Sequence, residues 1–227
     1  MRSLAWIGAV LLLTGGVAAQ DTWTGSYAGV TLGGMGGNVT VTNDSPGVDP
    51  GPFEYDIDSF APGVTAGYNY QIGGFVLGVE GQLGLLSPNG SGYIASSDPN
   101  HHQDLTLGRG LLADFGGRAG FTLGDLMFYA KGGLAFYTGE ALQESTKPQY
   151  ATTGTGGLTG GTIGAGVEYR FSPGVSLKAE YQHYAFGTAH GYQTALVEDP
   201  PTPVGYEFDN YHDVSFNTVK IGINFAF

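Results

Sequence analysis

The ten residues at positions 218–227, TVKIGINFAF, alternate between two kinds of side chain. One face of an extended chain would hold Val219, Ile221, Ile223, Phe225 and Phe227. The other face would hold polar or small residues. Strict alternation of this kind predicts a β-strand with one apolar face. The rest of the chain has to explain what that face contacts.

Three earlier segments repeat the pattern around a glycine: AGYNYQI (66–72), AGFTL (119–123) and AGVEYRF (165–171). Each leads into a short turn signal, at 73–74, 124–125 and 172–174, and then into a second alternating segment, at 75–83, 126–134 and 175–182. With SYAGVTLGG (26–34) as the first strand, the sequence predicts eight strands.

Four long connections join these strand pairs, at about 36–60, 87–105, 138–158 and 188–212. They are polar and rich in Gly, Pro, Asn and Asp, so we expect them to lack regular structure. All four fall at the end opposite the short turns. Short turns at one end, long loops at the other and an even strand number are typical of transmembrane β-barrels. The predicted fold is an all-β, eight-stranded, antiparallel, up-and-down transmembrane barrel.

The charged strand residues favour a membrane barrel over a soluble barrel of lipocalin type, in which the apolar face would point inward. Strand positions hold most of the basic residues, and they are matched by acids. An eight-stranded barrel leaves an interior that side chains can fill, and interior charges need partners. We therefore predict a structural ion network in the lumen, formed by Glu80, Asp114, Arg118, Lys131, Glu168, Arg170, Lys178, Glu180 and Lys220.

Residues 1–19 predict a secretory signal peptide, with Arg2, a short apolar stretch, and Val17 and Ala19 before the cleavage point. The barrel domain then spans 20–227. The chain contains no cysteine, and its formal net charge of -12 argues against a nucleic-acid partner. No cofactor is predicted.

The segments TVKIGINFAF, SLKAEYQHYAFG, GAGVEYRF, GGLAFY and WTGSYAGVTLGG together resemble the small outer-membrane β-barrel proteins of alphaproteobacteria, in the opacity-protein and OmpA-like group often labelled "porin family". The resemblance implies export through the periplasm to the outer membrane, among lipid and lipopolysaccharide. It also implies that Phe227 is the signal read by the barrel-assembly machinery.

The predicted function is structural, combining envelope integrity with a surface for interactions whose external ligand is unnamed. One alternative is a small-solute porin or channel. A second is a lipid A-modifying enzyme that would use His183, Ser215 and Asp213, although we predict that the protein is not an enzyme. The first long connection is acidic around EYDID (54–58), which leaves divalent-cation binding open.

Overall fold

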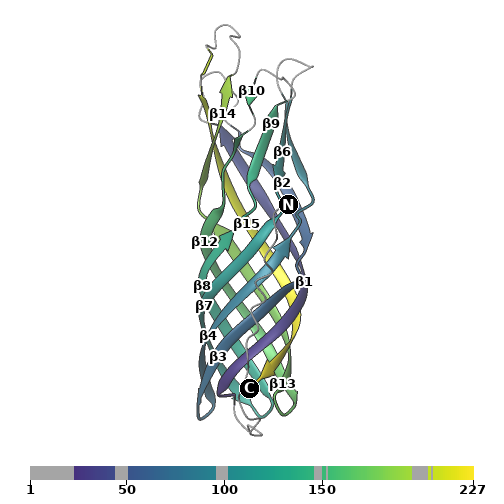
Figure 1. Ribbon diagram of the computed structural model, residues 1–227, viewed down its shortest axis with the longest axis vertical. Coiled ribbons are helices and arrows are strands. Elements are labelled where there is room, and N and C mark those ends of the chain that lie inside the picture. Colours follow the sequence, from purple (N-terminus) through teal and green to yellow (C-terminus); the bar gives the residue numbers. More distant parts are fainter. Residues whose placement is uncertain are drawn as a thin grey trace, which may run out of the picture.

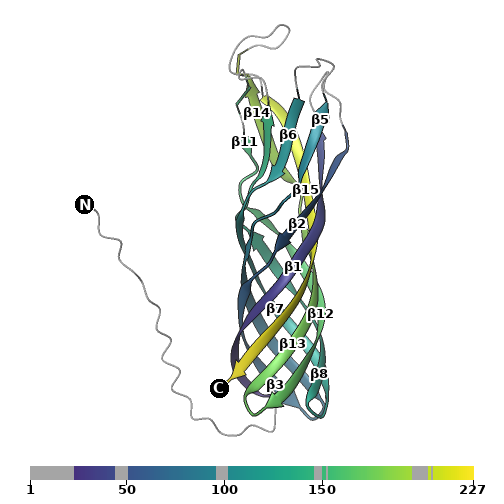
Figure 2. The ribbon, with the colours of Figure 1, turned by 90° about the vertical axis from the view of Figure 1, so that its right-hand side faces the viewer.

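The computed structural model describes residues 23–43, 51–95, 102–145, 150–151, 153–195, 204–205 and 207–227. The predicted signal peptide lies outside these residues and stays a prediction. The described chain forms one long, upright barrel of tilted strands (Figures 1 and 2). Within the described residues, no helix is long and apolar enough to cross a membrane.

The strands follow one another along the chain as β1 (Gly25–Asn43), β2 (Phe53–Phe60), β3 (Gly63–Ile72), β4 (Phe75–Leu86), β5 (Ser91–Ala95), β6 (His102–Leu107), β7 (Gly110–Leu123), β8 (Leu126–Tyr137), β9 (Ala141–Ser145), β10 (Tyr150–Ala151), β11 (Thr153–Gly154), β12 (Leu158–Ser172), β13 (Val175–Phe186), β14 (Ala189–Ala195) and β15 (Glu207–Ala226).

Eight of these strands close the lower barrel, in the order β1, β3, β4, β7, β8, β12, β13, β15 and back to β1. Every neighbouring pair is antiparallel. The first and last strands meet over a long register that begins with Tyr27 opposite Ala226. Three of the short connections turn at Gly73, Gly124 and Gly174, whose positive φ angles favour glycine. The predicted eight-stranded barrel and its short turns are confirmed.

The prediction of structureless long connections was wrong. β1 runs for 19 residues and β15 for 20, well past the predicted first and last strands. Above the lower barrel, β2 pairs with β1, and β14 pairs with β15. A separate four-stranded sheet, in the order β11, β9, β6, β5, completes this upper part (Figure 2). The connections form strands because their apolar residues alternate with polar ones.

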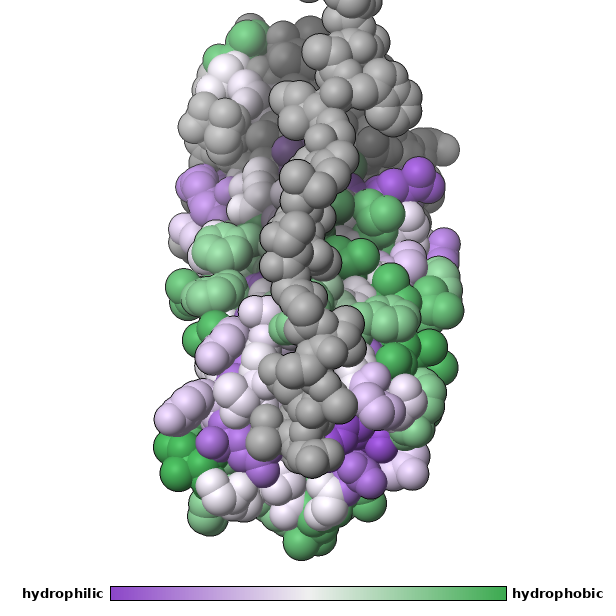
Figure 3. Space-filling view, turned by 60° about the horizontal axis from the view of Figure 1, so that its bottom comes forward, coloured by the Kyte–Doolittle hydropathy of each residue, from purple (hydrophilic) through white to green (hydrophobic). Residues whose placement is uncertain are grey.

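The outer wall of the lower barrel is apolar. Large hydrophobic side chains point outward from every strand of that wall, and many are half or more exposed. Examples are Val30 at 54%, Phe75 at 70%, Phe115 at 61%, Ile163 at 66% and Val219 at 64%. Figure 3 shows apolar side chains along both flanks of the wall. Such a surface is stable only against lipid, because water would make its exposure costly.

The inside of the upper part is apolar instead. We call the buried residues that fill it the upper core. They are Met35, Val39, Val41, Tyr55, Ile57, Ala61, Leu86, Leu105, Leu107, Leu112, Ala135, Tyr137, Ala141, Leu158, Tyr184, Phe186, Val214 and Phe216. Around it, β2 turns Glu54, Asp56 and Asp58 outward, where they are exposed. This part is built like a soluble protein.

On β15, the outer face changes from apolar to polar and the inner face from charged to apolar over the same few residues. On β15, Val219 faces outward into the apolar band and Lys220 faces inward among charges. A few residues higher, exposed Asp213 faces outward and buried Val214 inward. The strand continues without a break through both environments, because only the type of side chain on each face changes and the backbone pairing does not.

Phe216 tests the upper core. Its buried ring lies 5.2 Å from the ring of Tyr184 and 5.5 Å from that of Phe186, measured between centroids. Phe216→Ala should lower the free energy of unfolding by about 3–5 kcal/mol, because it leaves a cavity among packed rings. Urea unfolding in detergent would measure this. Phe115→Ala, on the lipid-facing wall, is the matched control; an equal loss in both variants would contradict the packing described here.

The burial of His212 in the same region predicts how the stability of the protein depends on pH. His212 lies above the apolar band, next to exposed Asp213, and is 2% exposed with no hydrogen-bond partner for Nδ1. Burial lowers the pKa of His212 to about 4, against 6.5 in the unfolded chain. The unfolded chain therefore binds the proton more readily between these values, and stability falls as the pH drops from about 6.5 towards 4.

At pH 5 the expected loss is about 2 kcal/mol relative to pH 7. Unfolding measured against pH for the wild type and for His212→Gln gives the comparison. The variant should flatten the dependence between pH 6.5 and 4. If it keeps the wild-type curve, His212 is not the source of that dependence.

Candidate functional site

A charged cluster fills the lumen of the lower barrel, and we call it the lumen network. Its carboxylates and cations project inward from β4, β7, β8, β12, β13 and β15, and each residue is at most 6% exposed. They are Glu80, Asp114, Glu168 and Glu180, with Arg118, Lys131, Lys178 and Lys220. The four negative and four positive charges sum to zero. Neutrality matters because an uncompensated charge in a desolvated interior is costly.

Glu80 contacts three of the four cations of the network. Its carboxylate lies 2.6 Å from Lys131 Nζ, 3.3 Å from Lys178 Nζ and 3.4 Å from Arg118 Nη1. The hydroxyl of Tyr27 also donates to it, at 2.7 Å. Four strands on different sides of the barrel therefore converge on one carboxylate.

Arg118 is enclosed on its flat faces and its edges. Its guanidinium carbon lies 4.6 Å from the ring centre of Tyr27 and 5.0 Å from that of Tyr129. Its Nε donates to Asn69 at 2.8 Å, and Nη1 lies 3.2 Å from Glu168. Stacking between rings with charged hydrogen bonds at the edge is an arrangement that suits arginine better than lysine.

Glu180 and Lys220 form the upper part of the network. Glu180 lies 3.5 Å from Lys220 and 3.6 Å from Lys131, and it accepts a hydrogen bond from Tyr129 at 2.8 Å. Lys220 Nζ donates to the amide oxygens of Gln82 and Gln182. The last barrel strand is thereby tied to β4 across the lumen.

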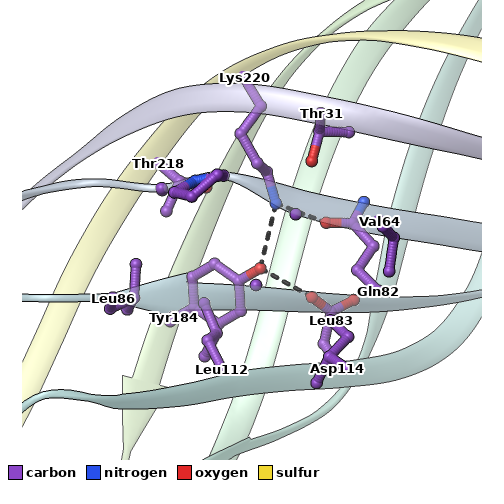
Figure 4. A pocket seen from close by; sticks show the side chains of 14 residues that line it. Thr31, Val64, Gln82, Leu83, Leu86, Leu112, Asp114, Tyr184, Thr218 and Lys220 are labelled. Carbon is purple, nitrogen blue, oxygen red and sulfur yellow. Dashed lines mark hydrogen bonds between the residues drawn. The ribbon is translucent and has the colours of Figure 1, made fainter.

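Tyr184 joins the lumen network to the upper core. Its ring packs in the core, while its hydroxyl donates to Asp114 at 2.8 Å and lies 3.3 Å from Lys220 Nζ. Figure 4 shows these groups meeting beside a cavity that Thr31 and Thr218 also line. The cavity measures about 20 Å³, enough for one water molecule.

Arg170 lies apart from the other predicted network residues. The structure places it at the lower end of the barrel, where it pairs with exposed Asp125 at 3.0 Å in the turn between β7 and β8. Its guanidinium carbon also lies 5.3 Å from the ring centre of Trp23. The other eight predicted residues lie together in the lumen.

Sequence reasoning missed the tyrosines and the neutral partners of the lumen network: Tyr27, Tyr129, Tyr184, Ser176 and Gln182. Their inward parity was the available signal, since all of them except Tyr27 share a strand face with a charged residue. Tyrosines count as apolar in a pattern search, which hid their role as hydrogen-bond donors.

The predicted alternative of a catalytic triad is not assembled. His183 Nδ1 is 2.9 Å from Asn217 Oδ1, and Asp213 accepts a hydrogen bond from Thr188. Ser215 lies opposite Ala185 rather than His183. The three residues therefore share a region of the outer wall without a relay between them.

The acidic first connection does not form a chelating site in the described chain. Glu54, Asp56 and Asp58 are separated along one face of β2. Asp44 and Asp49 lie outside the described residues. Within those residues, no group of three or more His, Asp or Glu side chains is placed to hold a metal ion.

A closed antiparallel barrel with an apolar outer wall and a charged interior defines a transmembrane β-barrel protein. The family model for the outer membrane protein beta-barrel domain matches residues 7–227. The chain belongs to this family, and it is an integral protein of the outer membrane.

Named relatives agree with this assignment. The 31 kDa outer-membrane immunogenic protein of Brucella melitensis is 28% identical over 230 residues, covering 92% of this chain and 87% of the relative. The 25 kDa outer-membrane immunogenic protein of Brucella ovis is 26% identical, covering 85% and 81%. These relatives are named as immunogenic outer-membrane proteins, not as enzymes.

Among solved structures, the outer membrane protein OprG of Pseudomonas aeruginosa matches with a TM-score of 0.59 at 10% identity, covering 92% of this chain and all of that one. At this identity the match shows the fold alone.

Glu80→Gln tests the lumen network. The amide keeps the shape of the side chain but leaves three cations around a neutral group. We expect a loss of about 3–5 kcal/mol in the free energy of unfolding, as for breaking a buried ion pair. Asp125→Asn is the control, because it removes a solvent-exposed pair worth at most about 1 kcal/mol. The temperature at which the folded gel band disappears would compare the stabilities of the two variants. Equal shifts in both variants would mean that the lumen network does not stabilise the barrel.

Proposed function

We propose that this protein is a closed structural barrel that braces the outer membrane and carries a rigid surface for external interactions. The observation that supports this most is the filling of the interior at two successive levels. The lumen network occupies the part inside the membrane, and the upper core occupies the part above it. A solute would have to displace both.

The lumen network supports the structural half of the proposal. Lys220 of β15 bonds to Gln82 of β4, and Tyr27 of β1 bonds to Glu80 of the same strand. The first and last strands are thus held to β4, two and three strands away around the barrel, as well as to each other. Such bonds resist changes in the cross-section of the barrel, as an envelope protein under lateral load requires.

The upper core supports the surface half. It fixes the upper strands from within, so their outward side chains are held in place without needing to pack. The relatives from Brucella carry the word immunogenic in their names, which fits a surface reached from outside. By the same reasoning, the short turns, the start of β1 and the end of β15 lie on the periplasmic side, and the upper part is extracellular.

Conductance tests the structural half against the porin alternative. Purified protein in planar bilayers should give no steady open-channel steps, because no continuous aqueous path crosses the network and the core. A general porin reconstituted in parallel shows that insertion and detection work. Steady unitary currents from this protein would overturn the closed-barrel proposal.

Epitope insertion tests the surface half. A tag placed after Gly205, which is exposed in the connection before β15, should bind antibody on intact cells. A tag after Gly124, in a turn at the opposite end, should bind only after the outer membrane is permeabilised. The reverse pattern would mean that the barrel is oriented the other way.

A further inference from the structure

Three polar side chains lie together on the outer wall, at the upper edge of its apolar band. Tyr181 and His183 project from β13, and Asn217 projects from β15. The Tyr181 hydroxyl donates to Asn217 Oδ1 at 2.6 Å, and His183 Nδ1 lies 2.9 Å from the same oxygen. Two donors held by one acceptor fix the positions of all three groups.

The level of this cluster follows from the strand registers. The lower row of the cluster holds Tyr181 beside Val219, Gly34 and Phe60, and both Val219 and Phe60 are 64% exposed. One row above it, the neighbours are Ala185, Ser215, Asn38 and Asp56. His183 and Asn217 share the row between. On the other side of β13, His183 lies opposite Ile163 of β12, which is 66% exposed. The cluster therefore lies at the edge of the apolar wall, with apolar neighbours below it and towards β12, and polar neighbours above it towards β2.

Because Tyr181 and His183 both contact Asn217 Oδ1, the atoms of the cluster that can still bind a ligand are defined. An amide oxygen can only accept, so His183 Nδ1 is the donor and Nε2 of the neutral ring is left as an acceptor. Asn217 keeps its Nδ2 hydrogens as donors. Within the described chain, neither Nε2 nor Nδ2 has a hydrogen-bond partner. Polar atoms fixed at the edge of a lipid-facing wall gain most from a ligand that offers both a donor and an acceptor.

The charged groups around the cluster limit the chemical class of ligand that can bind. Asp58 shares the row of His183 and Asn217 across Gly36, and exposed Asp56 and Asp213 lie just above. Three carboxylates disfavour direct contact with a phosphate. Hydroxyl and amide groups of a sugar meet no such repulsion, and they supply both a donor and an acceptor.

We propose that Tyr181, His183 and Asn217 form a binding site for the uncharged sugar part of an outer-leaflet glycolipid. The Tyr181 ring, 51% exposed, lies against the upper end of the acyl chains. His183 Nε2 accepts from a hydroxyl or amide N–H, and Asn217 Nδ2 donates to a sugar or amide oxygen. The site anchors one lipid beside the seam where β15 joins β13.

Lipid A is a suitable probe, in its native form and with both phosphates removed. The full-length protein in detergent is titrated with each, and retention of the lipid is measured by native mass spectrometry. Both forms should bind to the wild type with similar affinity. Loss of binding on dephosphorylation would overturn the proposal, because the phosphates would then be the recognised groups.

Two variants test whether lipid A binds at this cluster. His183→Phe keeps the ring and removes both nitrogens. Asn217→Asp keeps the acceptor for Tyr181 and His183 but removes the Nδ2 donor. Each should weaken binding by about fivefold or more, as expected for one or two hydrogen bonds.

His190→Phe is the matched control, since His190 is exposed and paired with Asp209 at 2.7 Å, away from the cluster. It should bind lipid A like the wild type. All three variants should keep heat-modifiable gel migration, which shows that the barrel is folded. Wild-type affinity in both cluster variants, or an equal loss in His190→Phe, would refute the site.

Discussion

The structure depends on a constraint that its two longest strands, β1 and β15, have to satisfy twice, once in the lower barrel and once in the upper part. In the lower barrel each strand lies between lipid and a narrow lumen, so apolar side chains point out and polar ones point in. In the upper part it lies between water and a packed core, so the preference reverses. β15 meets both demands in one continuous strand. Val219 and Lys220 satisfy the first, and Asp213 and Val214 satisfy the second. Backbone hydrogen bonding does not depend on which face of the strand is apolar. β1 and β15 therefore stay paired from Tyr27 opposite Ala226 to Asn43 opposite Asn210.

The lumen network follows from the same constraint. Once polar residues are turned into a lumen too narrow for bulk water, their charges can be stabilised only by one another. The protein meets this requirement with equal numbers of acids and bases, and with tyrosine, glutamine and asparagine at the remaining positions. Tyr184 has a particular place because its ring belongs to the upper core and its hydroxyl to the network. One side chain thus connects an apolar interior to a charged interior without leaving a buried polar group unpaired.

The lower barrel could be predicted from sequence because its strands share a repeated glycine, short turns and a single polarity of alternation. The upper strands could not, because their alternation has the opposite meaning. In β2 the stretch EYDID (54–58) predicts an acidic loop when only its carboxylates are counted. Its parity carries the real information, since Tyr55 and Ile57 are buried and the acids are exposed. Arg170 shows a second limit. Its parity matched the network, but parity does not give height, and at the lower end Asp125 is the nearer partner.

Where the inward residues of a strand hold it in place, its outward residues do not need to pack against other side chains of the protein. Below the boundary this freedom is limited, because every outward side chain must suit hydrocarbon. Above it, Glu54, Asp56 and Asp58 need only suit water, so these positions tolerate whatever chemistry an external contact requires. The row of His183 and Asn217 lies between the two regimes. There the hydrocarbon below makes an unpaired polar atom costly, while the headgroups above can pair with it. Polar side chains fixed by their neighbours are therefore most informative at this level, since neither the core nor bulk water accounts for their arrangement.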